Sequence, residues 1–448
     1  MKKLFTLSEE EIKMKIEQRD VNICIFGLGK MGLPLACAFA EAGFRVTGVD
    51  VNPKVVENVN RAITWFKEPE LDEKLAKAIK NKKLIATLDA EYAVKTSDFI
   101  LTIIPLGLDK EKKPDISKLI EVTEIISKNL RRGHVVGYET TLPIGTTENI
   151  LKPILEKTSL KAGKDFGLFY SPERLMSGKV FSRLRELKKI IGAVDRRTAF
   201  IAGEIYKTIC PAGIEIVSNP RTAEMIKLAA GIWRDVNIAF ANEMAKLADK
   251  YNIDIMEVIK AVNSSPRRLM LNPGCGVGGH CIPVYPYFII NSLENADQVV
   301  PLIKAARQTN ENMPKYTVKL AEEELKRRGK DIKGANIVIL GLAYRPYIKE
   351  TLNSPTLEMA KMLKTKGAKV SIFDPVFTKE EVEKITGAKS GEYEALLKKA
   401  DCVIVATMYE KFKGIREKTK NDCVIVDGRN KLNEADRGIG RPPKGKKI

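Results

Sequence analysis

Long apolar runs and an export signal are both missing from this chain of 448 residues. No apolar stretch reaches the roughly 18 residues that a membrane-spanning helix requires. The first segment has two lysines but lacks the apolar core of about 7–15 residues that marks a secretory signal. It predicts instead a short amphipathic helix, capped by Ser8 and followed by glutamates. We therefore expect a cytoplasmic protein without a membrane partner.

A disulfide framework is also missing. The seven cysteines are an odd number spread over a long chain, which does not suit a set of paired disulfides. Four of them fall in apolar segments and are predicted to be small core residues: Cys24, Cys37, Cys402 and Cys423. The other three lie in or near predicted loops: Cys210, Cys275 and Cys281. Any reactive thiol is expected among these three.

Positive charge is abundant, with a formal net charge of +19, but it is not concentrated. Lysine and arginine are scattered apart from brief clusters such as 326–328, and no aromatic residues alternate with them. Proteins that bind nucleic acid usually gather basic residues into a patch or stripe. The sequence therefore predicts a solvated, lysine-rich surface and no nucleic-acid partner.

One architecture occurs twice in the chain. Near the start, VNICIFGLGKMG is followed by a helical segment and GFRVTGVD, and much later ANIVILGLAYRP is followed by a helical segment and GAKVSIFD. Two further apolar segments match in order, SDFILTIIP with ADCVIVATM and GHVVGYETT with NDCVIVDGR. Buried strands that alternate with helices indicate parallel sheets with right-handed crossovers. The predicted fold class is α/β, with two Rossmann-like, doubly wound parallel-sheet domains.

The segment between the repeats differs from both. Residues 221–251 have helical periodicity and contain no proline, which predicts one helix of about 45 Å. That length exceeds the needs of one small domain, so we expect a central helical domain that joins the repeats and carries a subunit interface. Because the chain is too long for one core, we predict three domains: a first Rossmann domain at 1–205, a helical domain with a cysteine loop at 206–310, and a second Rossmann-like domain at 311–448.

The glycine-rich segment GLGKMG lies between a predicted strand and a predicted helix. Its first glycine permits a tight turn, the second lets a pyrophosphate approach the backbone, and the third allows close helix packing. An aspartate ends the next strand, where a carboxylate binds a ribose 2′-hydroxyl and repels a 2′-phosphate. The predicted contacts to NAD are Gly27, Gly29, Lys30, Met31, Gly32 and Asp50. A glycine turn without a ligand is the alternative. The second repeat lacks the glycine set, so we expect it to bind the nucleotide of a substrate.

The most informative segment is NPGCGVGGHCIPVYP. Its four glycines give a backbone that can wrap closely around a ligand, and Cys281 follows them. A thiol in such a loop acts as a nucleophile if nearby positive charge lowers its pKa. Two alternatives remain, a purely structural loop and a metal site at Cys275, His280 and Cys281. The spacing matches no common zinc pattern and a fourth ligand is missing.

Taken together, these segments resemble the UDP-glucose/GDP-mannose dehydrogenase family. The matching segments occur in family order and cover nearly the whole chain: GLGKMGLPLA, ETTLPIGTT, SPERLMSGK, AEMIKL, RDVNIAFANE, GVGGHCIPV, GLAYRP and VDGRN. Within the family, the chain is most similar to UDP-N-acetylmannosamine and UDP-N-acetylglucosamine dehydrogenases. The resemblance implies two successive oxidations of C6 of a nucleotide sugar by two NAD⁺, without release of the aldehyde.

The resemblance also implies roles for individual residues. Cys281 would hold the aldehyde as a thiohemiacetal and then as a thioester. Thr141 and Glu173 would position and activate the hydrolytic water, and Lys227 would stabilise the oxyanion. The implied substrate-binding residues include arginines suited to a diphosphate and part of the cysteine loop: Arg174, Arg234, Arg267, Gly278, Gly279, His280 and Arg345.

Taken singly, the implied catalytic residues also have structural interpretations. Lys227 suits a solvated helix face, Glu173 an ion pair with Arg174, and Thr141 a turn hydroxyl. Their ordered occurrence with the thiol loop favours catalysis. His134 precedes a buried strand and is predicted to be structural.

Several positions depart from the family pattern. Gly231 replaces the usual asparagine one helical turn after the lysine, and Tyr285 replaces the aspartate four residues after the cysteine. Leu106 replaces a threonine. These departures cluster at the sugar site and spare the glycine turn, which is compatible with a different sugar, a slower enzyme or a paralogue without turnover.

The leading hypothesis is an NAD-dependent four-electron oxidation of the C6 alcohol of a UDP-sugar. Arg174 and the GGHCIPV loop favour a UDP-N-acetylhexosamine such as UDP-N-acetylmannosamine. The alternatives are a two-electron hydroxyacid-type dehydrogenase and a non-catalytic nucleotide-sugar-binding paralogue. We expect NAD as the cofactor, no bound metal, and a homodimer or higher homo-oligomer formed through the central helix.

Overall fold

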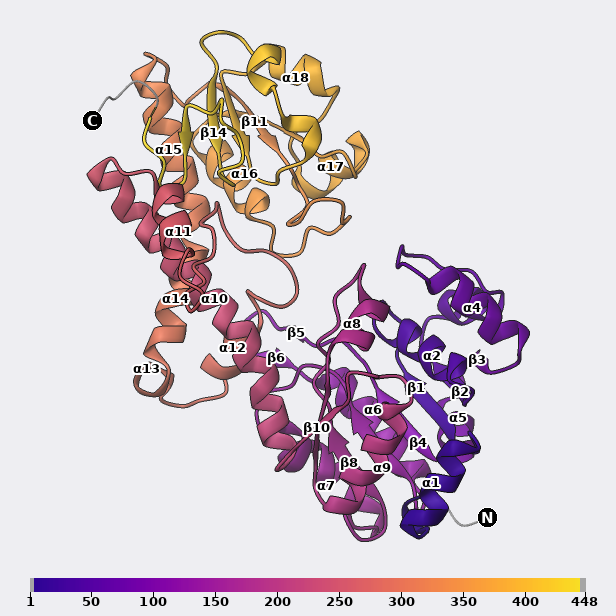
Figure 1. Ribbon diagram of the computed structural model, residues 1–448. Coiled ribbons are helices and arrows are strands. Elements are labelled where there is room, and N and C mark those ends of the chain that lie inside the picture. Colours follow the sequence, from indigo (N-terminus) through magenta and orange to yellow (C-terminus); the bar gives the residue numbers. More distant parts are fainter. Residues whose placement is uncertain (1–3, 444–448) are drawn as a thin grey trace. The chain divides into compact units, whose positions relative to one another are not determined.

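The computed structural model describes residues 4–443, which form two compact units divided between Ala230 and Gly231 (Figure 1). The first unit contains α1 (Glu9–Glu17), β1 (Asn22–Phe26), α2 (Gly32–Glu41), β2 (Arg45–Val49), α3 (Pro53–Asn60), α4 (Leu71–Lys80), β3 (Leu84–Thr87), α5 (Ala90–Thr96), β4 (Phe99–Thr102), β5 (Gly107–Leu108), β6 (Pro114–Asp115), α6 (Ser117–Asn129), β7 (Val135–Tyr138), α7 (Lys152–Leu155), β8 (Gly167–Tyr170), α8 (Val180–Glu186), β9 (Lys189–Ala193), α9 (Arg196–Lys207) and β10 (Ile214–Val217). Helix α10 (Pro220–Tyr251) contains the division.

The strands of the first unit form one sheet in the order β10-β9-β8-β7-β4-β1-β2-β3. The pairs are parallel except for β8 and β9, which run antiparallel, so this sheet is mixed at one end where the sequence predicted parallel pairing throughout. Strand β1 pairs with β2 on one side and with β4 on the other. The strand order therefore reverses at β1, and ligands of such sheets bind beside the carboxyl ends of the strands at this reversal.

The central strands β4, β7 and β8 are buried along their whole length, because both faces of the sheet are covered by helices. Along β1, Ile23 and Ile25 join a core with residues of α2 and α9. The alternate residues Cys24 and Phe26 join a second core with residues of α5 and α6. Helices on both faces are visible in Figure 1. This two-core arrangement is the doubly wound α/β architecture that the alternation of strands and helices predicted.

The second unit repeats the architecture on a smaller scale. Its elements after α10 are α11 (Ile255–Val262), α12 (Tyr285–Ile290), α13 (Ala296–Val299), α14 (Pro301–Glu311), α15 (Met313–Arg327), β11 (Asn336–Leu340), α16 (Pro355–Thr365), β12 (Lys369–Phe373), α17 (Lys379–Thr386), α18 (Tyr393–Lys399), β13 (Cys402–Val405), β14 (Val424–Asp427) and β15 (Arg437–Gly438). The sheet order is β12-β11-β13-β14-β15, and its first four strands match β2-β1-β4-β7 of the first unit strand for strand. The predicted internal repeat is therefore confirmed in sequence order and in strand pairing.

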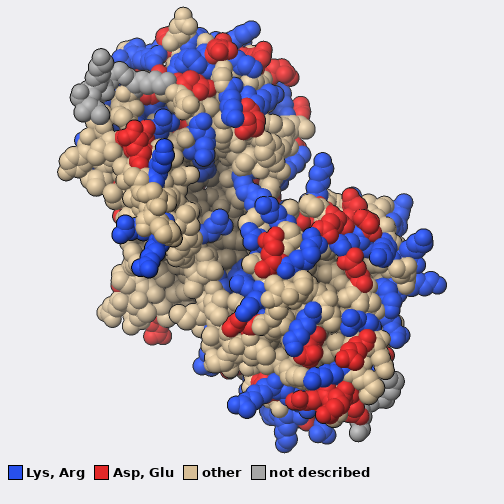
Figure 2. Space-filling view, viewed as in Figure 1, with Lys and Arg blue, Asp and Glu red and all other residues tan. Residues whose placement is uncertain are grey.

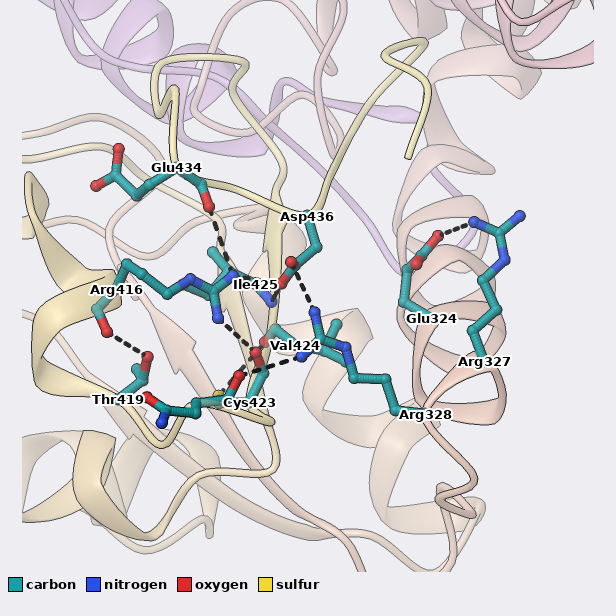
Figure 3. A network of polar contacts seen from close by, with 11 residues as sticks. Glu324, Arg327, Arg328, Arg416, Thr419, Cys423, Val424, Ile425, Glu434 and Asp436 are labelled. Carbon is teal, nitrogen blue, oxygen red and sulfur yellow. Dashed lines mark hydrogen bonds and ion pairs between the residues drawn. The ribbon is translucent and has the colours of Figure 1, made fainter. Parts of the chain in front are cut away.

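The last segment of the second unit is held by the largely buried carboxylate of Asp436 (Figure 3). Asp436 accepts hydrogen bonds from Arg328, Arg416 and the backbone N–H of Ile425, and its side chain lies between the two arginines. Arg416 also donates to the carbonyl of Cys423 at 2.7 Å. Since Asp436 directly precedes β15, these bonds fix the fifth strand against β14.

The predicted long helix is confirmed as α10, which has 32 residues and therefore a length of about 48 Å at 1.5 Å per residue. The predicted N-terminal helix is α1, whose Ser8 cap forms a reciprocal capping box with Glu11. Within residues 4–443, no helix combines the length and apolar character that crossing a bilayer requires. On the face drawn in Figure 2, basic side chains are scattered among acidic ones, as the sequence indicated.

A fully buried ion pair joins α14 to α10 in the second unit. The Arg307 guanidinium donates to the Asp235 carboxylate at 2.7 Å, and the two side chains are only 2% and 1% exposed. Burial raises the pKa of Asp235, while Arg307 and Asn310 oppose that rise. Arg307 also lies 3.5 Å from the carbonyl oxygen of Ile282. The pair thus links the packing of two helices to the loop that carries Cys281.

Replacing Arg307 by methionine is expected to lower the free energy of unfolding by about 3–5 kcal/mol, because Asp235 remains buried without its charge partner. Adding Asp235→Leu should recover most of that loss. Urea denaturation followed by circular dichroism measures both effects. A double variant as unstable as Arg307→Met alone would contradict the electrostatic interpretation.

Candidate active site

The predicted site residues of the first unit follow the carboxyl ends of adjacent strands. Strand pairing aligns Phe26 with Thr102, Thr102 with Tyr138, and Tyr138 with Tyr170. The glycine turn follows the first of these residues, Thr141 lies three residues after Tyr138, and Glu173 lies three residues after Tyr170. Carboxyl ends of parallel strands meet at one sheet edge. The fold therefore places the glycine turn, Thr141 and Glu173 along the same edge.

The glycine turn has the geometry that a phosphate-binding turn needs. Gly27 has φ +91°, and a Cβ there would lie 2.5 Å from the carbonyl oxygen of Ile103. A Cβ on Gly32 would lie 1.8 Å from the carbonyl oxygen of Gly27, whereas a Cβ on Gly29 would meet nothing within 4 Å. Open space beside Gly29 and an α2 N-terminus that lacks a side-chain cap fit a pyrophosphate.

Asp50 holds this turn through its carboxylate. One oxygen accepts the backbone N–H of Leu28 at 3.0 Å, and the other accepts that of Asn52 at 3.0 Å. In the second repeat, Asp374 likewise accepts the N–H groups of Leu342 and Ala343, at 2.7 and 2.9 Å. The aspartate is thus a structural part of both repeats, and in the first it also lies where a ribose hydroxyl is expected.

Two of the four predicted catalytic residues are brought together. The Lys227 ammonium on α10 lies 3.7 Å from the Glu173 carboxylate and donates to the backbone carbonyl of the same residue. Both side chains are largely buried. The Glu173 loop is further held by Glu68, which accepts the N–H of Val180 at 2.8 Å. Lys227 is therefore not a solvated helix residue, and its charge is directed at the Glu173 loop.

A buried ion pair that the sequence did not predict interacts with Glu173. Lys189 donates to Glu139 at 2.8 Å, and both side chains are nearly inaccessible to solvent. Burial raises the pKa of Glu139, which Lys189 opposes and Glu173 reinforces. The sequence did indicate the importance of this region, since Glu139 is the first residue of the ETTLP segment. The sequence did not indicate its partner, because Lys189 comes from a different strand.

The three cysteines predicted to lie in loops differ in accessibility. Cys210 and Cys275 are buried, whereas Cys281 is the exposed cysteine among the seven. Burial raises the pKa of Cys210 to about 11 and also raises that of Cys275. The four cysteines predicted to be core residues are all buried. Cys281 is therefore the thiol available for chemistry.

The cysteine loop has no regular secondary structure and depends on polar contacts within the second unit. Asn242 of α10 accepts the N–H of Gly274 at 2.9 Å, and Asn310 accepts a bond from the Asn242 amide at 2.8 Å. The carbonyl of Gly428 accepts the N–H of Cys275 at 3.0 Å. Asn310 in turn donates to Asp235, so one chain of hydrogen bonds joins the buried ion pair to the loop.

The loop glycines allow close approach to protein atoms. A Cβ on Gly278 would lie 2.5 Å from the Tyr344 side chain, and one on Gly279 would lie 2.8 Å from its ring. The N–H of Gly279 donates to the carbonyl of Leu352 at 2.8 Å. The sequence predicted close approach to a ligand. The contacts within this chain are instead to the segment after β11, so the glycines join the loop to the second Rossmann-like sheet.

The remaining predicted substrate residues are mostly exposed. Arg234, Arg267 and Arg345 present exposed side chains in the second unit, as a diphosphate contact requires. His280 is also exposed and lies 3.2 Å from the Glu350 carboxylate. Arg174 instead donates to the carbonyl of Lys188 in the first unit.

The metal alternative needs Cys275 and Cys281 on one ion. Cys275 is buried with its sulfur 3.5 Å from the carbonyl of Ala406, whereas His280 faces Glu350. Among residues 4–443, no group of three or more His, Cys, Asp and Glu side chains has a metal-binding arrangement.

Comparison with known proteins identifies the chain. Family models of the UDP-glucose/GDP-mannose dehydrogenase family match its NAD-binding domain at residues 21–210, its central domain at 221–312 and its UDP-binding domain at 338–434. The two repeats with a glycine turn in the first and a thiol loop between them define an NAD-dependent oxidoreductase of nucleotide sugars. The chain belongs to the UDP-glucose/GDP-mannose dehydrogenase family.

Individual relatives cover almost the full length. The chain is 35% identical to a UDP-N-acetyl-D-mannosamine dehydrogenase of Pyrococcus horikoshii, over 94% of this chain and 99% of the relative. A solved structure of the UDP-D-ManNAc dehydrogenase from that organism has a TM-score of 0.85 at 33% identity, covering 94% of this chain and 99% of the other. A UDP-glucose dehydrogenase from Pyrobaculum islandicum has a TM-score of 0.82 at 29% identity, covering 93% and 96%. The similarity thus extends to enzymes named for different sugars.

Alanine at two glycines of the turn should separate binding from folding. Gly29→Ala has room for its methyl group, so the melting temperature should stay unchanged while NAD⁺ binds at least about tenfold more weakly. Gly32→Ala should lower both the melting temperature and the NAD⁺ affinity, because its Cβ overlaps the Gly27 carbonyl. Calorimetric titration and thermal denaturation measure them. Unchanged NAD⁺ affinity in Gly29→Ala would exclude the pyrophosphate position.

Proposed function

We propose that this enzyme oxidises the C6 alcohol of a UDP-N-acetylhexosamine, with UDP-N-acetylmannosamine as the favoured substrate, to the uronic acid in two NAD-dependent steps. The observation that carries the proposal is the accessibility of Cys281 alone among seven cysteines, in a loop fixed to the second Rossmann-like sheet. NAD would be held by the glycine turn and Asp50. The chemistry that bound NAD⁺ supplies is hydride acceptance, once in each oxidation.

The side chains divide the proposed reaction between them. After the first oxidation, the Cys281 sulfur supplies the electron pair of a new bond to C6, and the carbonyl π pair moves to the oxygen as an oxyanion. Lys227 stabilises that oxyanion. The second hydride leaves C6 as the carbonyl re-forms, which gives a thioester on Cys281. Glu173 then accepts a proton from a water positioned by Thr141, and hydrolysis returns the thiolate.

The choice of sugar rests on sequence and similarity. The SPERLMSGK segment with Arg174 and the GGHCIPV loop favour an N-acetylated sugar, and the mannosamine enzyme of Pyrococcus horikoshii is the relative described above at 35% identity. Arg267 and Arg345 are the proposed contacts to the diphosphate, with Arg234 and the loop residues Gly278, Gly279 and His280 at the sugar. The division into domains at 205 and 310 and a cytoplasmic location remain part of this proposal.

The stoichiometry of turnover tests the proposed reaction. With excess NAD⁺ and a panel of UDP-sugars, we expect two NADH per molecule of UDP-N-acetylmannosamine consumed, measured by absorbance at the NADH band. Cys281→Ser should form no detectable uronic acid while its NAD⁺ affinity stays unchanged. Cys423→Ala, which alters a buried cysteine of the same unit, is the matched control and should retain activity.

Two results would overturn this proposal. One NADH per sugar with free aldehyde in solution would remove the thioester half of the mechanism. Full formation of acid by Cys281→Ser would remove the nucleophile.

A binding protein without turnover is the second candidate, because Gly231 and Tyr285 replace residues of the family pattern. Tight binding of UDP-sugars with no NADH from any of them would favour it. The match to a UDP-binding domain favours either of these candidates over a hydroxyacid dehydrogenase.

We also propose a homodimer or a higher homo-oligomer formed through α10. Its second-unit part carries exposed apolar side chains one or two turns apart, and these are Trp233, Phe240, Leu247 and Tyr251. A second copy of the chain can cover such a stripe. Phe240→Glu should shift the sedimentation behaviour toward the monomer, and an unchanged oligomer would exclude this face.

A further inference from the structure

The two departures from the family pattern lie against each other. Gly231 is in α10, and Tyr285 is the first residue of α12. A Cβ on Gly231 would lie 2.5 Å from Cδ2 of the Tyr285 ring and 3.3 Å from its Cε2. Real Cβ atoms essentially never come so close to a ring carbon. The observed position of the Tyr285 ring therefore requires a residue without a side chain at position 231.

The tyrosine ring is well fixed. Tyr285 is only 9% exposed, and its ring packs at 6.0 Å from that of Phe288. Its backbone N–H donates to the carbonyl of Cys281 at 2.9 Å. The ring has little freedom to move away from Gly231, so the close approach is a packing constraint and not the end of a flexible side chain.

The hydroxyl of this ring reaches the sulfur atom of the proposed nucleophile. Tyr285 donates a hydrogen bond to Sγ of Cys281 at 3.1 Å. The hydroxyl thus contacts the sulfur from within the unit, while Cys281 itself stays exposed on its other side. A donor to sulfur favours the thiolate over the thiol, because only the anion is a strong acceptor. An ionised carboxylate at the same position would disfavour the thiolate by like-charge repulsion.

We propose that Tyr285 is a catalytic residue that stabilises the Cys281 thiolate through its hydroxyl, and that Gly231 is the position that makes room for it. The inference rests on the proposed function of Cys281 as the nucleophile. The two replacements are then coupled. The Tyr285 hydroxyl donates to the sulfur, and glycine at position 231 of α10 leaves the space that the Tyr285 ring occupies. The site is a rearranged catalytic site.

Other titratable groups near the sulfur come from neighbouring segments of the unit. Tyr344, which follows β11, interacts electrostatically with Cys281, and burial together with Glu350 raises the pKa of Tyr344 to about 12. His280 precedes the cysteine and lies 3.2 Å from Glu350. Arg345 follows Tyr344. A change confined to the Tyr285 hydroxyl leaves all of these groups in place.

The reactivity of the thiol tests the proposal without any substrate. Alkylation of Cys281 by iodoacetamide is followed from pH 6 to pH 10 in the full chain, with Cys281→Ser to identify the labelled site. Tyr285→Phe keeps the ring and should make alkylation several-fold slower near neutral pH, because the sulfur loses its hydrogen-bond donor. With an active substrate, turnover by Tyr285→Phe should recover as the pH rises. Tyr287→Phe, whose hydroxyl donates to Glu311, is the matched control and should keep the parent profile.

The glycine gives an independent test. Alanine usually stabilises a helix interior by up to about 1 kcal/mol over glycine. Gly231→Ala should instead lower the melting temperature and shift the alkylation profile as Tyr285→Phe does, because its methyl group displaces the ring. In the Tyr285→Phe background it should shift the profile no further.

An identical alkylation profile in Tyr285→Phe and the parent would overturn the proposal, as would a stabilising Gly231→Ala with unchanged thiol reactivity. These readouts do not depend on turnover. If no UDP-sugar is oxidised but the alkylation profiles of the two variants shift, the proposed function is wrong, whereas the proposed effect of Tyr285 on Cys281 is supported.

Discussion

The loop that carries Cys281 has no secondary structure of its own, and its hydrogen bonds to the surrounding unit are the constraint on which the functional interpretation depends. Backbone groups in such a loop need partners other than a helix or sheet ladder. Asn242, Gly428 and Leu352 supply them from a helix, a strand end and a turn. A proposed nucleophile needs a well-defined position, and here three separate elements hold the backbone of the loop that leads to Cys281.

The two Rossmann-like repeats share one type of turn. In each repeat a glycine with positive φ, Gly27 or Gly341, follows the first strand, and an aspartate after the next strand accepts at least one backbone N–H of that turn. The first copy keeps open space beside Gly29, which suits a pyrophosphate. In the second copy the equivalent segment packs against the cysteine loop through Tyr344. The first turn is thus the proposed cofactor site, and the second supports the loop of the proposed nucleophile.

Sequence alone predicted the repeated sheets, the long helix, the glycine turn and a set of three loop cysteines that includes Cys281, because each depends on local patterns of apolar residues, glycines and strand ends. It did not predict that Cys210 and Cys275 are buried. It did not predict the antiparallel pairing of β8 with β9, or the Lys189 partner of Glu139. Pairing across elements depends on tertiary packing, which a linear pattern does not encode. The contact of Tyr285 with Gly231 is of the same kind. Each residue was noticed as a departure, but only the packed structure shows that one makes room for the other.

Trapping the covalent intermediate tests the proposed chemistry most directly. Glu173→Gln removes the proposed base for thioester hydrolysis, so a sample quenched after mixing with NAD⁺ and UDP-N-acetylmannosamine should accumulate acylated enzyme. Peptide mass spectrometry is expected to find the uronyl mass on the peptide that contains Cys281. An unmodified Cys281 peptide in every quenched sample of an enzyme that still produces NADH, or an adduct on another residue, would contradict the assignment.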